Sequence, residues 1–355
     1  MNMQHSRIAL VSALAMMMTA CSGGGGDSSA DNGGGTTSPT SAIALSEANM
    51  EDIASVALTS ESTVSMMGGG ALGQLVGAET STGGSVLNLL AGKAINRFLA
   101  GVKNAPAAGA LVGAEFEEVE NCEDGGTLTY RYDVDNMESD PKAGDSFSVT
   151  ANNCKYGNVT DSGRLSFVVN NYTGSWQGNY DETFVGQIDI SVDADHLRSA
   201  TANTSVDMDG DMRLTADTRA SNYWYYTMKS NSLTYTSQVG SFSQTVTVSN
   251  VDSAVRDNFA ISASETTKMT YNFAVASSAL NGSGSVALLE TIVGYWDATA
   301  PSAGKVRVTG SNGTLVMTYL PGGNVALQLQ RDGAADVTRT VSRSDLDDLF
   351  ELDTN

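Results

Sequence analysis

Two short groups of aspartates are the residues of this chain best suited to hold a metal ion. Asp193 and Asp195 form the first group, and Asp207, Asp209 and Asp211 form the second. Calcium prefers oxygen ligands, and closely spaced carboxylates supply them. Asp209 is followed by Gly210, however, and Asp-Gly is also a strong signal for a tight hairpin turn. We therefore expect no cofactor, and calcium at Asp207, Asp209 and Asp211 is the alternative.

The second group resembles only the opening of an EF-hand loop. Position six of such a loop is Gly, but Met212 stands there, and position twelve is Glu, where this chain has Thr218. A strand-like run of about 12 residues separates the two groups, which predicts that they lie about 40 Å apart. On this interpretation the two groups cannot share an ion.

Nucleophilic catalysis has little support in the sequence. Beyond residue 20 the chain contains one histidine, His196, which follows Asp195 between two strand-like runs. A Ser-His-Asp triad would need a distant serine to meet it, and the Gly-x-Ser-x-Gly elbow does not occur. We expect His196 to be a solvated turn residue, and we do not expect an enzyme.

Four consecutive aromatic residues, Tyr223, Trp224, Tyr225 and Tyr226, form the most unusual local motif. In a strand, alternate side chains point to opposite faces, so one aromatic pair must face away from the core or line a cavity. Such a pair is suited to bind sugars, hydrophobic ligands or proteins. Cross-strand packing is the alternative. Trp224→Ala is expected to weaken binding more than stability if the motif is a site.

Cys122 and Cys154 are expected to form a disulfide. They flank two alternating runs, 126–134 and 145–150, around a turn-rich stretch. A hairpin centred near residue 138 places Leu128 opposite Ser148 and Cys122 opposite Cys154. A metal site at this pair would need two further Cys or His ligands nearby.

The N-terminus has the pattern of an export signal. Arg7 is followed by an apolar run over 8–20, which is too short to cross a bilayer. The run ends in Met18-Thr19-Ala20-Cys21, which resembles the lipobox of bacterial lipoproteins. The resemblance implies cleavage before Cys21, acylation of that cysteine and, because Ser22 follows it, location in the outer membrane.

Composition limits the partners of the exported chain. Residues 21–42 are rich in Gly and Ser and predict a flexible linker. The formal net charge of −21 repels phosphate backbones, so we exclude nucleic acid as a partner. The lipid is then the expected contact with the membrane, and a protein, glycan or lipid is the expected partner.

Residues 43–104 have helical periodicity and are expected to pack on a sheet. Ser46 is a candidate cap for the first helix, and an apolar stripe over 86–102 predicts a second. A short closing helix is expected near the C-terminus, capped by Ser344.

Residues 115–355 are expected to form a mainly β domain. Short runs of period two alternate with turn signals such as Asn281-Gly282, Asn312-Gly313, Pro321-Gly322-Gly323 and Asp332-Gly333. Short connections require antiparallel neighbours. The pattern predicts a meander of about 12–15 strands, curved into a half-barrel, a barrel or a sandwich.

The chain resembles a group of uncharacterised proteobacterial outer-membrane lipoproteins. The resemblance is carried by the lipobox at 18–21, the Cys122/Cys154 hairpin with Gly-Gly-Thr-Leu-Thr-Tyr at 125–130, and the Asn-Gly-Thr-Leu-Val and Asp-Gly turns at 312–316 and 332–333. That resemblance implies the architecture and the compartment only: a lipid-anchored protein facing the periplasm or the cell surface. Because the sequence shows no catalytic constellation, we expect a non-enzymatic structural or binding role. One alternative is a periplasmic carrier of lipid or another hydrophobic ligand, since a curved sheet with helices on it is similar to lipoprotein carriers. The other is a cell-surface glycan-binding or adhesion protein.

Overall fold

The computed structural model describes residues 41–65, 114–134, 141–177, 183–220, 223–258, 266–295 and 301–348. The predicted export signal, Cys21 and most of the linker lie outside these residues. The helix expected over 86–102 lies outside them as well. The remaining predictions can be compared with the structure directly.

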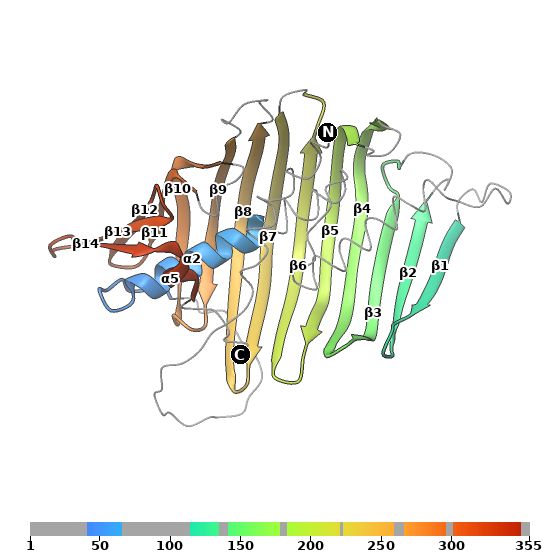
Figure 1. The fold of residues 1–355 in the computed structure, drawn as a ribbon, viewed down its shortest axis with the longest axis horizontal. Helices are drawn as coiled ribbons and strands as arrows, with labels where there is room; N and C mark the ends of the chain where they lie inside the picture. Colours follow the sequence, from blue (N-terminus) through green and yellow to red (C-terminus); the bar gives the residue numbers. More distant parts are fainter. Residues whose placement is uncertain are drawn as a thin grey trace, which may run out of the picture.

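One antiparallel sheet forms the body of the protein, as expected from the alternating runs (Figure 1). Its 14 strands follow one another in chain order, and each pairs with its sequence neighbours. The strands are β1 (Ala114–Asn121), β2 (Thr127–Val134), β3 (Ser146–Tyr156), β4 (Val159–Gln177), β5 (Thr183–Ala200), β6 (Thr204–Asp217), β7 (Tyr223–Val239), β8 (Phe242–Asn258), β9 (Thr266–Ser277), β10 (Gly282–Tyr295), β11 (Ala303–Thr309), β12 (Gly313–Leu320), β13 (Asn324–Arg331) and β14 (Val337–Ser342).

The sheet is open, so the expected closed barrel and sandwich are both wrong for the described residues. β1 and β14 are its two edges and do not pair with each other. β1 carries Glu117, Glu118 and Glu120, and charges of one sign on an edge strand disfavour pairing with a further strand. The sheet twists strongly, so that β13 and β14 run across the direction of β4–β8 in Figure 1.

One face of the sheet is a continuous apolar surface, which we call the inner face. The cross-strand register places Leu128 of β2 next to Ala151 of β3, and the same match of apolar residues continues to Leu315 and Leu329 at the other end. These side chains are almost completely buried. Alternate residues point to the opposite, outer face, which is rich in Thr, Ser and charged side chains.

Helix α2 (Met50–Ser65) lies across the inner face, where it contacts β8, β9, β12 and β13 (Figure 1). This helix lies within the predicted helical segment 43–104, but the prediction of two N-terminal helices is not confirmed, because the second one, over 86–102, lies outside the described residues. Helix α2 begins later than Ser46 suggested: the Asn49 carbonyl accepts the first helical hydrogen bond, from the Ile53 amide at 3.0 Å. The Asn49 side chain instead accepts from the Ser46 amide at 2.8 Å and so closes the turn before the helix.

The segment leading into α2 is fixed to the β10–β12 end of the sheet. Asn312 accepts from the Leu45 amide at 2.7 Å and donates to the Leu45 carbonyl at 3.0 Å. Gly310 permits this contact, because a Cβ atom there would lie 2.4 Å from the Ile43 carbonyl oxygen. The start of the described chain is therefore held by residues more than 260 positions away.

Helix α5 (Arg343–Asp348) closes the described chain and packs against α2, as expected for a closing helix. Its cap is Ser342 and not Ser344, because the Ser342 hydroxyl accepts from the Asp345 amide at 3.0 Å. The Ser55 hydroxyl of α2 donates to the Leu346 carbonyl of α5. The two helices therefore form one unit on the sheet.

Four of the five turn signals are confirmed, and one is wrong. The turns at 281–282, 312–313, 321–323 and 332–333 join β9–β10, β11–β12, β12–β13 and β13–β14. Asp209-Gly210 instead lies inside β6, where Gly210 has a φ of 135° and pairs with Leu233 of β7. A glycine in an irregular strand and a glycine in a hairpin turn look alike in the sequence, since both can require φ above zero.

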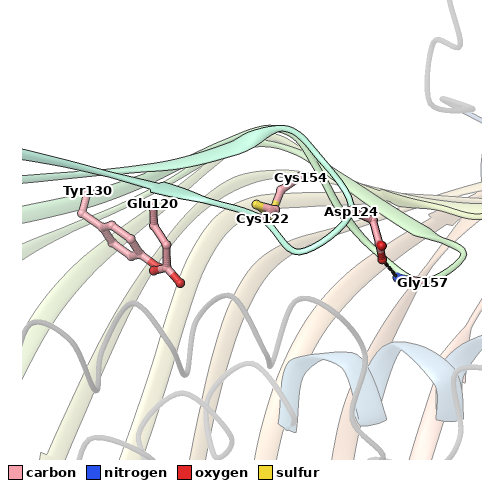
Figure 2. Close-up of a disulfide and its surroundings, with 6 residues drawn as sticks. All are labelled: Glu120, Cys122, Asp124, Tyr130, Cys154 and Gly157. Atoms are coloured by element: carbon pink, nitrogen blue, oxygen red, sulfur yellow. Dashed lines mark hydrogen bonds between the residues drawn. A yellow bond between two sulfur atoms is a disulfide. The ribbon is translucent and has the colours of Figure 1, made fainter.

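The disulfide between Cys122 and Cys154 is present, with Cα atoms 5.4 Å apart (Figure 2). Its setting differs from the prediction. Cys122 lies in the turn between β1 and β2, and Ser148 pairs with Arg131 and not with Leu128. The bond ties this turn to β3, and the Asp124 carboxylate reinforces it by accepting from the Gly157 amide at 2.6 Å (Figure 2).

Removing the disulfide with Cys122→Ser and Cys154→Ser is expected to lower the free energy of unfolding by about 3–4 kcal/mol, because the sequence separation is 32 residues. Denaturant unfolding of this double variant and of the parent chain measures the difference. Both chains carry Cys21→Ser, so that thiol titration counts only this pair. Two free thiols in the unreduced parent would contradict the bond.

Candidate functional site

The outer face of the sheet is the face on which polar side chains can meet a partner. Inner-face residues such as Tyr130, Leu214 and Met317 are at most 1% exposed. On the outer face, by contrast, Val168 is 41% exposed, and its direct cross-strand partners are Ser146 and Ser191. Concave regions and groups of chemically competent residues on the outer face are therefore the candidates for a site.

A groove of about 480 Å³ crosses the outer face from β4 to β8. It lies where the cross-strand register shifts in several neighbouring pairs of strands. The shifts fall between Ala194 and Leu197 in β5, between Gly210 and Arg213 in β6, and between Ser249 and Asp252 in β8. Such irregularities bend strands locally. The groove is lined by Ser166, Val168, Ser191, Val192, Asp193, Asp211, Met212, Arg213, Lys229, Ser230, Asn231, Asn250 and Val251.

Two rows of outer-face residues border the groove. One row contains Asp193 and Asp211, which are direct cross-strand partners. The other contains Arg213 and Lys229, which are also direct partners. Carboxylates accept hydrogen bonds and the two cations donate them, so a ligand between the rows meets acceptors on one side and donors on the other.

The basic row is already paired with carboxylates of the sheet. Arg213 donates to both oxygens of Asp189, at 2.9 and 2.6 Å. This bidentate pair lowers the pKa of Asp189, chiefly through the hydrogen bond from Arg213. Lys229 lies 3.7 Å from Asp252. The two cations are therefore held in place and partly neutralised.

The two aspartate groups predicted to lie far apart are in fact side by side. β5 and β6 form a hairpin that turns at 201–203, so Asp193 pairs with Asp211, and Arg198 pairs with Asp207. The prediction was wrong because it placed the hairpin turn at Asp209-Gly210. All five aspartates follow the outer face of one hairpin.

The three aspartates of the calcium alternative do not converge. Asp207, Asp209 and Asp211 alternate along β6, and residues on one face of a strand are about 6.6 Å apart. Asp207 instead pairs with Arg198 at 3.2 Å. The calcium prediction therefore finds no support in this geometry.

A tighter group consists of Asp195, His196 and Asp209, whose potential ligand atoms lie within 4.8 Å of one another. His196 Nδ1 lies 2.6 Å from Asp195 and 3.3 Å from Asp209. The hydrogen bond to Asp195, followed by the charge of Asp209, raises the pKa of His196. His196 is exposed as predicted, but it sits at an irregularity within β5, with a φ of 49°, and not in a turn.

The aromatic motif begins β7 and divides between the two faces. Tyr226 is buried, and Trp224 packs against the core and meets the Tyr226 ring edge-on at 6.4 Å. Tyr225 is 41% exposed, and Tyr223 on the same face stacks under the Arg256 guanidinium at 4.1 Å. Truncation of Trp224 therefore perturbs the core, and Tyr225 is the aromatic residue open to a partner.

A buried carboxylate under α2 was not predicted. Glu61 is 3% exposed and accepts from the hydroxyls of Tyr271 (β9) at 2.8 Å and Tyr319 (β12) at 2.5 Å. Arg343 of α5 is also buried and supplies a positive charge. The available signal was the position of Glu61 on the apolar stripe that contains Ile53 and Ala57.

Burial raises the pKa of Glu61, while Arg343 and the two tyrosine hydroxyls oppose that shift. Desolvation, together with the nearby Glu61, also raises the pKa of Tyr271 and Tyr319 well above 10. No described side chain at this cluster lines the groove. The cluster therefore joins α2, α5 and the sheet, and we do not assign it to the candidate site.

Glu61→Gln is expected to change how stability depends on pH. The folded-state pKa of Glu61 is raised above the ordinary value of 4.5. The wild-type carboxyl therefore contributes most to stability below pH 4.5, and this contribution is lost as the pH rises through the folded-state pKa. The wild-type free energy of unfolding should thus fall relative to Glu61→Gln between about pH 4 and neutrality. Denaturant unfolding across this range tests it, with exposed Glu117→Gln as control. Parallel curves for wild type and Glu61→Gln would contradict it.

Comparison with models of protein families, with curated proteins and with solved structures finds no match for this chain. Among the described residues, no helix is long and apolar enough to span a bilayer.

Proposed function

We propose that the protein is a membrane-anchored lipoprotein, located in the outer membrane, with a non-enzymatic binding role exerted through the outer face of its sheet. The lipobox at 18–21 supports the anchor. The Gly/Ser-rich composition of residues 21–40 is that of a flexible tether with an r.m.s. span of roughly 25 Å, and from Ser41 onwards the chain is bound to Ser283 of β10. The sheet then works as a platform held away from the lipid.

The burial of most of the inner face is the observation that carries this proposal. Leu128 on β2 and Leu327 on β13, near the two ends of the sheet, have no exposed surface, and inner residues such as Trp224 and Met269 are partly buried against the same core. A partner therefore meets the outer face, the two edges or the loops. Of these, the outer face contains the groove and the exposed Tyr225.

The fold supports such a role by keeping the outer face rigid. Residues on neighbouring strands are joined by the backbone ladder, and threonine pairs such as Thr215–Thr227, at 2.6 Å, link strands on this face. A site whose groups are already fixed loses less conformational entropy on binding. The long strands thus supply a preorganised surface.

A carrier of hydrophobic cargo is the less favoured alternative. Cargo would have to enter the inner face, where α2 is fastened by Glu61 to β9 and β12 and by Ser55 to α5. Opening that face would expose apolar surface and break a buried network, both of which are costly.

Cys21→Ser is expected to abolish acylation. When the full chain is expressed in a Gram-negative host with labelled palmitate, the wild-type protein should carry label and sediment with outer membranes. The variant should carry none and lose that association, because the lipid is the proposed anchor. Labelling of the variant, or an unlabelled wild type, would refute the anchor.

Truncation of an aromatic side chain should have different effects on the two faces of β7. Tyr225→Ala is expected to change the free energy of unfolding by no more than about 0.5 kcal/mol, as for most surface substitutions, and to weaken partner binding. Trp224→Ala is expected to destabilise by up to about 3 kcal/mol because it removes packing from the core.

Photo-crosslinking in cells tests whether Tyr225 contacts a partner. A photoreactive residue at Tyr225 should give discrete adducts, whereas one at Asp332, exposed in the β13–β14 turn and five strands beyond β8, should give none. Equal labelling at both positions, or no adduct at Tyr225, would contradict a binding role for this face.

A further inference from the structure

We propose that the groove across β4–β8 is a binding site for a neutral, elongated, polyhydroxylated ligand, that is, an uncharged oligosaccharide. This inference rests on the proposed function and specifies its ligand. It is carried by three features of the groove: the mixture of hydrogen-bonding groups, the balance of charge and the shape.

The groove offers both the hydrogen-bond donors and the acceptors that a sugar hydroxyl needs. Asp193 and Asp211 accept, whereas Asn231 and Asn250 present amides that both donate and accept. A hydroxyl is a donor and an acceptor at once. Neighbouring hydroxyls of a sugar can therefore be bound by acceptors from one row and donors from the other.

The exposed amides are placed there by irregular backbone. Asn250 has a φ of 53° and lies at the register shift between Ser249 and Asp252. Asn231 faces it from β7, and both side chains are exposed. Asn tolerates this backbone conformation better than most residues. The register shift therefore presents the Asn250 amide at the groove.

The charges do not select a charged ligand. Two carboxylates face two cations, in a chain whose formal net charge is −21. Arg213 and Lys229 already have carboxylate partners in Asp189 and Asp252, which weakens their attraction for an anion. The opposed carboxylates of Asp193 and Asp211 repel each other, and hydroxyl donors from a neutral ligand relieve that repulsion without adding charge.

The shape favours a chain of sugars over a single one. Five strands border the groove, and four interstrand spacings give a length of about 19 Å. On β7, Tyr225 lies four residues from Lys229 on the same face, at about 13 Å. An exposed tyrosine ring is suited to contact the apolar face of a sugar, so a branch or an end of the ligand can reach it.

A glycan array carrying neutral, acidic and amine-bearing oligosaccharides tests the inference with the full-length protein in detergent. Neutral oligosaccharides are expected to be retained, and calorimetric titration with the best of them gives its Kd. Asp211→Asn and Asn231→Ala should each raise that Kd at least tenfold. Asp332→Asn makes the same change of charge in the β13–β14 turn, at the far end of the sheet, and should leave the Kd unchanged.

Retention of only acidic or only amine-bearing glycans would overturn the neutral ligand class, as would equal binding by Asp211→Asn and wild type. An array without any retained glycan would overturn the inference as well. Photo-crosslinking at Tyr225 distinguishes this failure from that of the proposed function. If no glycan is retained but Tyr225 gives adducts, the outer face still binds a partner and only the oligosaccharide is excluded. If Tyr225 gives no adducts either, the proposed binding role is contradicted as well.

Discussion

The structure depends on burying one side of a single, very wide sheet. Antiparallel neighbours match apolar residues across every strand pair, from Leu128 beside Ala151 to Leu315 beside Leu329. A sheet with one apolar face must be covered on that face, and α2 covers the part over β8, β9, β12 and β13. Because the inner face is committed to the core, the outer face is free to vary in chemistry without changing the fold.

Local signals in the sequence predicted the strands, the sheet type and most of the turns, because those depend on alternation and on glycine or asparagine at hairpins. The register could not be predicted, since one irregular residue shifts every later pair. Cys122 illustrates the difference. Its bond to Cys154 was predicted, yet the chain turns at 122–126 instead of continuing β2.

The groove could not be predicted for the same reason. Its residues come from five strands, and Asp193 meets Asp211 only because the β5–β6 hairpin turns at 201–203. Reading Asp209-Gly210 as the turn separated residues that the fold brings together. The division of the aromatic motif between two faces, by contrast, could be predicted, because strand alternation places Tyr225 and Trp224 on opposite sides. Only the structure shows which of the two is exposed.

Glu61 shows how the cover and the sheet are aligned. α2 buries Met50, Ile53 and Leu58 in the core, but apolar contacts are not directional and define its position along the sheet only weakly. A buried carboxylate that accepts from Tyr271 and Tyr319 is satisfied at one position only, because displacement of the helix would leave its charge unpaired. We infer that Glu61 contributes more to the specificity of helix docking than to net stability, since burying a charge offsets much of what its hydrogen bonds contribute. The helix thereby holds β9 and β12 in one arrangement, and the irregular strands that border the groove extend from that fixed part of the sheet.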